Sequence, residues 1–171
     1  MDYLNAGKMI HIRKAVLSDI ADITTIYNEA VVNTTATFDT EIKTIANRTD
    51  WFNNRNENFP VIVAEKQDMV VGFASLNKWS DKKAYDITSE ISLYVQSEYR
   101  GLGIGKQLVE IIVDIAAGTK LHSIIARITE GNEQSIHLHK INGFEIIGVM
   151  RKAGIKFGKL LDVTLMQKML K

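Results

Sequence analysis

Residues 100–105, Arg100-Gly101-Leu102-Gly103-Ile104-Gly105, follow the apolar run Leu93-Tyr94-Val95 and precede an amphipathic stretch that extends to Ala117. Glycine has no Cβ, so consecutive backbone N–H groups in such a turn can point toward one ligand. The start of the following helix adds partial positive charge, and Arg100 and Lys106 add formal charge. This combination predicts a cradle for a pyrophosphate group. A glycine-rich start to a helix without any ligand is the alternative that the turn alone leaves open.

Two other phosphate-binding motifs do not fit this turn. A Walker A loop requires Gly-Lys followed by Ser or Thr, whereas Gly105-Lys106 is followed by Gln107. A dinucleotide fingerprint requires the period G-x-G-x-x-G, whereas the glycines over residues 101–105 alternate with single residues. No βαβ unit is expected before the turn. The turn is therefore a phosphate-binding candidate of another class.

The apolar pattern outward from the turn changes between the period of a strand and the period of a helix. Ser18 is expected to cap the first helix, and Asn142-Gly143 to end the last one. Runs of antiparallel strands interrupted by helices indicate a mixed α+β domain rather than a regular βαβ fold. We expect helices over residues 18–32, 42–54, 105–117 and 133–141, and strands over 9–14, 61–65, 69–79, 88–95, 123–129, 144–150 and 162–169.

The composition limits the class of protein. The 171 residues fit one domain, and the net charge of +1 gives no electrostatic reason to expect nucleic acid or a membrane as partner. Cysteine is absent, which excludes disulfides, thiolate metal sites and a cysteine nucleophile. The apolar runs are far shorter than a membrane span, and the N-terminus lacks a secretory signal pattern. We expect a cytoplasmic protein with one domain over residues 9–171 and an N-terminal extension over 1–8.

Several spaced motifs together resemble one family. The pattern Arg100-x-x-Gly103-x-Gly105 after an apolar strand resembles the R/Q-x-x-G-x-G/A signature of the GNAT acetyltransferase superfamily, whose element order also matches. From about Met9 to Leu170 the chain resembles the phosphinothricin and methionine sulfoximine acetyltransferase branch. The stretches that carry this resemblance are Ile26–Val31, Thr37-Phe38, Pro60–Glu65, Ala84–Val95, Asn132-x-x-Ser135-x-x-x-His139, Gly143-Phe144 and Lys156-Phe157-Gly158-x-x-x-Asp162.

The resemblance implies an acetyl-CoA-dependent N-acetyltransferase with the GNAT fold, a mostly antiparallel sheet of about seven strands flanked by about four helices. It implies that Glu90 lies beside the acceptor amine and that His139 is a second acid or base. Members of this branch are usually homodimers, so we expect a homodimer. The residues implied to contact the cofactor are Leu93, Tyr94, Val95, Arg100, Gly101, Leu102, Gly103, Ile104, Gly105, Lys106, Asn132 and Ser135.

Acyl transfer to an amine needs a base, because the amine arrives as an ammonium ion and must lose a proton before it attacks a thioester. Glu90 is the candidate, and a strand-edge carboxylate that pairs with a lysine is the alternative. A strand N–H such as that of Leu93 would stabilise the oxyanion. His139 would give a proton to the CoA thiolate, and a structural histidine is its alternative. His137 and His139 lie two residues apart on a helix and do not face each other, so no metal is expected.

The chain departs from the branch pattern where the acceptor should bind. Relatives often carry Arg or Lys after the tryptophan that matches Trp79, whereas Ser80 stands here, so Lys82 or Lys83 would supply the cation. Leu160 stands where relatives often have tryptophan. We expect a small amino-acid-like acceptor of the phosphinothricin, methionine sulfoximine or methionine sulfone type. A core position is the equal alternative for Phe38. The expected acceptor-binding residues are Phe38, Ser80, Lys82, Glu90, Ile91 and Ser92.

Two other functions remain open from the sequence. Acetylation of a protein or peptide amine would need an open groove in place of a closed pocket. A non-catalytic CoA-binding sensor would bind acetyl-CoA tightly without turnover on any amine. Glu90 and the intact turn over residues 100–105 favour an enzyme.

Overall fold

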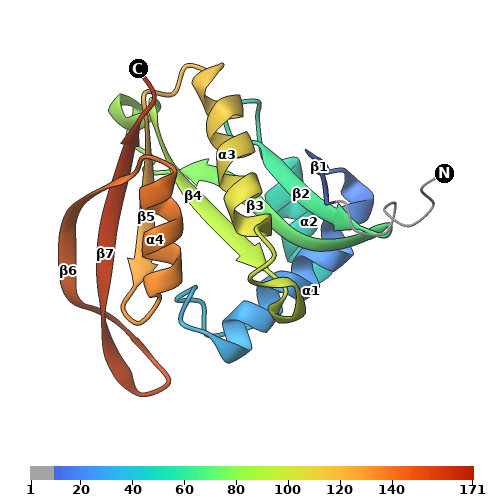
Figure 1. Cartoon of the computed structure of the whole chain (residues 1–171), viewed down its shortest axis with the longest axis horizontal. Helices are drawn as coiled ribbons and strands as arrows, with labels where there is room; N and C mark the ends of the chain where they lie inside the picture. The colour runs from blue at the N-terminus through green and yellow to red at the C-terminus, as the bar shows by residue number, and fades with distance from the viewer. Residues whose placement is uncertain (1–9) are drawn as a thin grey trace.

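A computed structural model describes residues 10–171, and the expected extension over 1–8, together with Met9, lies outside the described residues. Within residues 10–171 the chain forms a seven-stranded sheet in the order β1-β2-β3-β4-β5-β7-β6, with four α-helices (Figure 1). All neighbouring strands pair antiparallel except β4 and β5. This confirms the expected mixed α+β class. The elements are β1 His11–Lys14, α1 Ile20–Asn33, α2 Ile45–Asn53, β2 Val61–Lys66, β3 Met69–Lys78, β4 Thr88–Val95, α3 Ile104–Ala117, β5 Ser123–Thr129, α4 Glu133–Ile141, β6 Glu145–Lys156 and β7 Lys159–Met169.

Local hydrogen bonds move several boundaries from their expected positions. The first helix begins two residues after Ser18, because the Asp19 carboxylate accepts the Val16 N–H at 2.8 Å and a 3-10 turn forms there first. The second helix is shorter than expected and is capped by the Thr44 hydroxyl. β6 and β7 are longer than expected because their antiparallel pairing continues to a tight turn. Pairing between strands therefore extended elements whose own residues gave no such signal.

Helices cover both faces of the sheet, and each face has its own core (Figure 1). On one face, Leu108 and Ile112 of α3 pack against Leu76 of β3 and its neighbours. On the other face, Ile23 of α1 packs against Phe73 of β3. Side chains along β3 thus alternate between two apolar layers, as expected for a strand buried on both faces. No helix within residues 10–171 has the length and apolar character needed to cross a membrane.

The parallel pairing of β4 with β5 is short, and it determines where the site lies. The two strands pair at three positions, of which Glu90 opposite Ile125 is the last. Beyond it, β4 continues along β3 to Val95, and β5 continues along β7 to Thr129. The strands therefore spread apart (Figure 1), and the edge of β4 that faces β5 has no strand partner over residues 91–95. A cavity of about 630 Å³ opens at this separation.

Candidate active site

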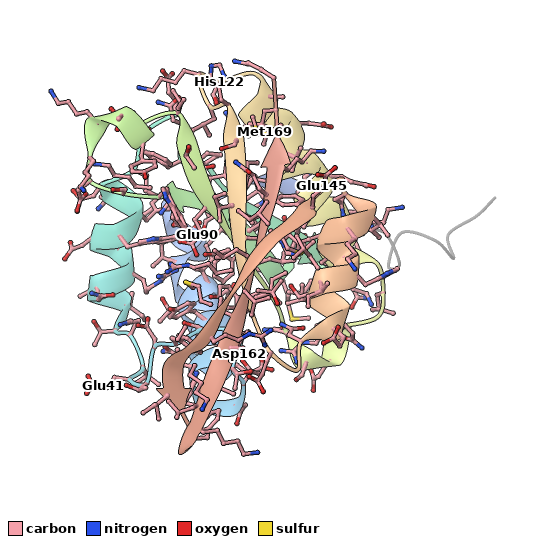
Figure 2. All side chains as sticks on the ribbon, turned by 90° about the vertical axis from the view of Figure 1, so that its left-hand side faces the viewer. Glu41, Glu90, His122, Glu145, Asp162 and Met169 are labelled. Atoms are coloured by element: carbon pink, nitrogen blue, oxygen red, sulfur yellow. The ribbon has the colours of Figure 1, made fainter. Side chains whose placement is uncertain are left out.

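The cavity between β4 and β5 brings together most of the residues predicted from the sequence. Glu90 lies near the middle of the molecule (Figure 2). The glycine turn, Val95 and Lys106 lie further along the chain from β4 to the start of α3 and do not line the cavity. Ser80 and Lys82 also do not line it. The predicted residues that do are Phe38, Glu90, Ile91, Ser92, Leu93, Tyr94, Asn132, Ser135 and His139.

The glycine turn has the geometry of an anion cradle. Gly101 and Gly103 have φ angles of +76° and +79°, and a Cβ at either would meet no other atom within 4 Å. Glycine is therefore required there by backbone conformation and leaves open space for a ligand. The first helical hydrogen bond of α3 runs from the Gln107 N–H to the Gly103 oxygen, so the N–H groups of residues 104–106 have no partner within the helix. Such a helix start fits a diphosphate.

Two cations flank this cradle. Arg100 Nε donates to the Val95 oxygen at 3.0 Å, and its Nη2 lies 3.8 Å from a carboxylate oxygen of Glu29. Lys106 lies 3.6 Å from Glu110, one helical turn further along α3. Both cations are exposed, and each is already near one carboxylate. An incoming diphosphate would therefore compete with Glu29 and Glu110 for these charges.

Beyond Glu90, the unpaired edge of β4 offers backbone groups to the gap beside β5. The Tyr94 ring packs on the ring of Tyr27, 5.2 Å between centroids, and on that of Phe73 at 5.3 Å. Burial raises the pKa of the Tyr94 phenol, so it stays neutral. Leu93 stands opposite Ala74 of β3 in the strand register. Its other edge faces the separation from β5, where the pairing has ended.

Glu90 is held by an arginine that the sequence analysis did not single out. Arg127 of β5 donates from Nε to one Glu90 carboxylate oxygen at 2.5 Å and from Nη2 to the other at 2.7 Å. Its guanidinium also lies 5.8 Å from the centroid of the Trp79 ring. The signal in the sequence was a single charged residue in the otherwise uncharged run 123–129. The alternative interpretation of Glu90 was a strand-edge carboxylate paired with a lysine. Glu90 does have a cationic partner, but this partner is an arginine.

A row of small polar side chains continues the acceptor side of the cavity. The Asn77 amide donates to the Ser92 hydroxyl at 3.0 Å and to the Ser75 hydroxyl at 3.3 Å. Its oxygen accepts from Arg55 at 3.2 Å. Asn77 stands opposite Glu90 in the β3–β4 register. Hydrogen-bonding groups thus lie beside the candidate base.

His139 is buried and already hydrogen-bonded on one side. Its Nδ1 lies 2.8 Å from the Ser135 carbonyl oxygen, and its ring packs edge-on against Phe144 at 5.0 Å. Burial lowers the pKa of His139, so the ring is neutral near pH 7. A carbonyl oxygen only accepts, so Nδ1 carries the proton and Nε2, buried without a hydrogen-bond partner, presents a lone pair. The ring in this state can accept a proton at Nε2.

Asn132 and Ser135 lie at the start of α4 and line the cavity. The Asn132 side-chain oxygen accepts the Ser135 N–H at 3.3 Å, which makes it the N-cap of this helix. The capping role accounts for an asparagine here even without a ligand.

The loop over residues 34–44 covers another side of the cavity and carries Phe38. The Tyr27 hydroxyl donates to Asp39 at 2.6 Å, and burial raises the pKa of Tyr27 to about 12. Lys156, buried at the end of β6, donates to the Thr37 oxygen at 2.7 Å. Phe38 lies directly on Gly154 of β6, where a Cβ would overlap its ring. Contacts with α1 and β6 therefore hold Phe38 at the cavity.

A second cation that the sequence analysis did not single out is buried in the wall. Arg48 lies between two rings, 3.8 Å from the centroid of Trp51 and 4.6 Å from that of Tyr27. Burial lowers its pKa, and its Nε has no hydrogen-bond partner. By contrast, Lys82 is exposed and its backbone N–H donates to the Ser80 hydroxyl at 3.3 Å. The structure thus brings Arg48 and Arg127 to the cavity instead of the expected Lys82.

Comparison with known proteins agrees with this geometry. The family described as acetyltransferase (GNAT) domain matches residues 12–165, and the chain belongs to this family. An L-methionine sulfoximine/L-methionine sulfone acetyltransferase from Pseudomonas aeruginosa is 41% identical over 158 residues, which cover 91% of this chain and 92% of that protein. The expected GNAT fold and acetyltransferase class are therefore confirmed.

Two solved structures are similar over nearly the whole chain. A ribosomal-protein-alanine N-acetyltransferase from Brucella melitensis has a TM-score of 0.90 at 41% identity and covers 93% of this chain and 99% of that one. A GNAT phosphinothricin acetyltransferase from Sinorhizobium meliloti, solved in complex with acetyl-CoA, has a TM-score of 0.90 at 34% identity and covers 94% and 88%. Within residues 10–171, no three His, Asp or Glu side chains gather as a metal site would require.

Proposed function

We propose that this chain transfers the acetyl group of acetyl-CoA to the amine of a small amino-acid-like acceptor, of the methionine sulfone, methionine sulfoximine or phosphinothricin type. The observation that carries the proposal is the position of Glu90. Its carboxylate lies in the cavity where β4 and β5 separate, on the strand that leads toward the glycine turn. One strand therefore connects a candidate base to a candidate cofactor cradle.

The residues around the separation fit acetyl-CoA, which supplies an activated acetyl thioester. The turn over residues 100–105 and Lys106 would hold its diphosphate through backbone N–H groups and positive charge. The backbone of Leu93–Val95 would hydrogen-bond the amides of the pantetheine arm at the open edge of β4. Asn132 and Ser135 would contact the same arm from the start of α4. Support comes from the unpaired edge of β4 and the left-handed glycines.

The transfer must move two protons away from the acceptor nitrogen. Glu90 would take one from the ammonium, and the nitrogen would then form its bond to the acetyl carbon while the bond from that carbon to sulfur breaks. The second proton must leave the new amide nitrogen, and the departing thiolate must gain one. His139 would relay this proton: its Nε2, which has a free lone pair in a buried position, would accept the proton from nitrogen and then give it to the thiolate sulfur. The Leu93 N–H would stabilise the oxyanion.

The test is release of free CoA, detected with a thiol reagent. The chain has no cysteine, so the protein itself does not react with the reagent. The acceptor panel contains L-methionine sulfone, L-methionine sulfoximine, phosphinothricin and a short peptide that begins with alanine. We expect turnover on at least one of the three amino-acid analogues. Tight acetyl-CoA binding without turnover on any acceptor would contradict the proposal and favour a CoA-binding sensor.

Acetylation of a protein N-terminus is the second candidate. It is favoured by the similarity to the ribosomal-protein-alanine N-acetyltransferase of known structure. The peptide in the panel separates the two candidates, because turnover on the peptide alone would transfer the proposal to protein acetylation. The cavity is closed on one side by the loop that carries Phe38, which favours a small acceptor.

We also propose that the enzyme is a cytoplasmic homodimer. β6 is an edge strand of the sheet, and an edge strand with exposed apolar side chains needs a cover. Light scattering in solution tests the dimer, and a monomer mass would contradict it. The exposed apolar residues on the β6–β7 hairpin are Ile146, Ile147, Val149, Met150, Ile155, Phe157, Leu160 and Met169.

A further inference from the structure

The candidate base is not free in this structure. Arg127 occupies both carboxylate oxygens of Glu90, in the bidentate geometry that arginine forms best. An acceptor ammonium must therefore compete with the guanidinium for the same oxygens. The Arg127 side chain is 51% exposed and the Glu90 side chain 16%, so the pair faces the cavity on its arginine side. A pair open to water contributes little net stability and can exchange partners.

Two other cations near the cavity are buried. Arg48 is buried between the rings of Tyr27 and Trp51. Lys156 is buried and donates to the Thr37 oxygen. Among the cations that line the described cavity, Arg127 is the one with a half-exposed side chain. It is therefore the cation that an acceptor can reach.

We propose that Arg127 binds the carboxylate of the acceptor, and that the acceptor enters by exchanging ion partners with the Glu90–Arg127 pair. The ammonium of an α-amino acid would take the place of the guanidinium on Glu90, and its carboxylate would take the place of Glu90 on Arg127. A single carbon separates these two charges in an α-amino acid, so one molecule can meet both members of the pair. This inference rests on the proposed function and names the group that selects its acceptor.

The exchange makes selectivity depend on the acceptor's own charge. An amine without a carboxylate would have to displace Arg127 from Glu90 and leave the guanidinium without a partner. A peptide N-terminus has an amide where the amino acid has a carboxylate, so it is disfavoured for the same reason. The centroid of the Trp79 ring lies 5.8 Å from the guanidinium, so this ring would support Arg127 through a cation–π contact.

The test compares L-methionine sulfone with its methyl ester, in the wild type and in Arg127→Met. We expect the wild type to prefer the acid in kcat/KM, and Arg127→Met to lose that preference by roughly ten- to a hundredfold, mainly through KM for the acid. The acid-to-ester ratio of kcat/KM is measured in each enzyme, and the ratio in the wild type is divided by the ratio in Arg127→Met. The different basicities of the two amines cancel in this quotient, because both enzymes use the same two acceptors. Arg127→Lys keeps the charge but not the bidentate geometry, so it should recover part of the preference.

Two controls identify the residue. Arg48→Met removes the buried cation of the same cavity, and Lys140→Met removes an exposed cation on α4. The inference is overturned if the preference falls in Arg48→Met but not in Arg127→Met, or if Arg127→Met loses equal activity on both acceptors. Thermal melting of each variant checks that it is folded. If Arg127→Met turns over both acceptors with the wild-type preference for the acid, the inference about Arg127 is overturned and the proposed function stands. If the wild type turns over no acceptor of the panel, the proposed function and the inference are both overturned.

Discussion

The two ends of β4 are built in different ways. At the Val95 end, the chain turns through left-handed glycines and presents backbone N–H groups. At the Glu90 end, side chains from α1, α2, β5, α4 and β6 converge on one cavity. A backbone cradle needs glycine at set positions whatever surrounds it, whereas a convergent pocket depends on how distant segments pack. The candidate cofactor cradle is therefore visible in one short stretch of sequence, whereas the candidate acceptor pocket is visible only in three dimensions.

The largest effect is expected from removing the charge at the acceptor end. Glu90→Gln keeps the size of the side chain but cannot take a proton, so kcat should fall by roughly 10²- to 10⁴-fold. Affinity for acetyl-CoA should change little, because the cradle lies at the other end of β4. CoA release and equilibrium binding measure the two quantities. Glu41→Gln is the matched control, since Figure 2 shows Glu41 at the outer edge of the molecule, away from Glu90.

A smaller effect with the opposite pattern is expected at the cofactor end. Gly103→Ala places a Cβ on a residue with φ of +79°, which costs about 1–2 kcal/mol, so acetyl-CoA affinity should fall by roughly 5- to 30-fold. KM for the acceptor should be nearly unchanged. Gly118→Ala is the control at the other end of α3, where φ is −80°. Equal losses in both glycine variants would show that the left-handed turn is not what binds the cofactor.

A more modest change is expected where β6 supports the acceptor pocket. Gly154→Ala pushes the Phe38 ring away from its position, so KM for the acceptor should rise by about three- to tenfold, with acetyl-CoA affinity retained. Gly148→Ala on the same strand has no atom within 4 Å of the added Cβ and serves as control. Adding Phe38→Leu to Gly154→Ala should restore part of the affinity for the acceptor. An unchanged KM for the acceptor in Gly154→Ala would show that the position of Phe38 does not affect acceptor binding.

The smallest effect concerns His139, which lines the cavity from α4. Burial lowers its pKa below the unfolded value of about 6.5, so the unfolded chain binds more protons as the pH falls below that value. The stabilisation from the neutral ring is complete above about pH 6.5 and decreases below it. Urea unfolding at pH 7.5 and 5.5 should show a smaller decrease in His139→Gln than in the wild type. Equal decreases would mean that the ring charges freely in the folded protein.

Most elements and the glycine turn before α3 could be predicted from the sequence, because period-two and period-3.6 patterns and a glycine turn are local features. The β6–β7 hairpin was predicted too short, since its extra length comes from pairing between strands. Arg127 and Arg48 were not singled out, because an isolated arginine gains meaning only from the Glu90 carboxylate or the rings it meets. Lys82 was expected from a neighbouring position in the sequence, yet the loop after β3 keeps it exposed and away from the cavity.

The short contact between β4 and β5 also bears on the cooperativity of the fold. This contact joins two antiparallel half-sheets. One contains β1, β2, β3 and β4, the other contains β5, β7 and β6, and each has long strand ladders of its own. Three parallel pairs join these halves, together with α3, which packs on β4, and α4, which packs on β5 and on α3. The joint is thus a natural place for local unfolding, and a molecule bound along it would touch both halves at once. Its binding free energy would then stabilise the whole sheet, so the free energy of unfolding would increase with the concentration of the bound molecule.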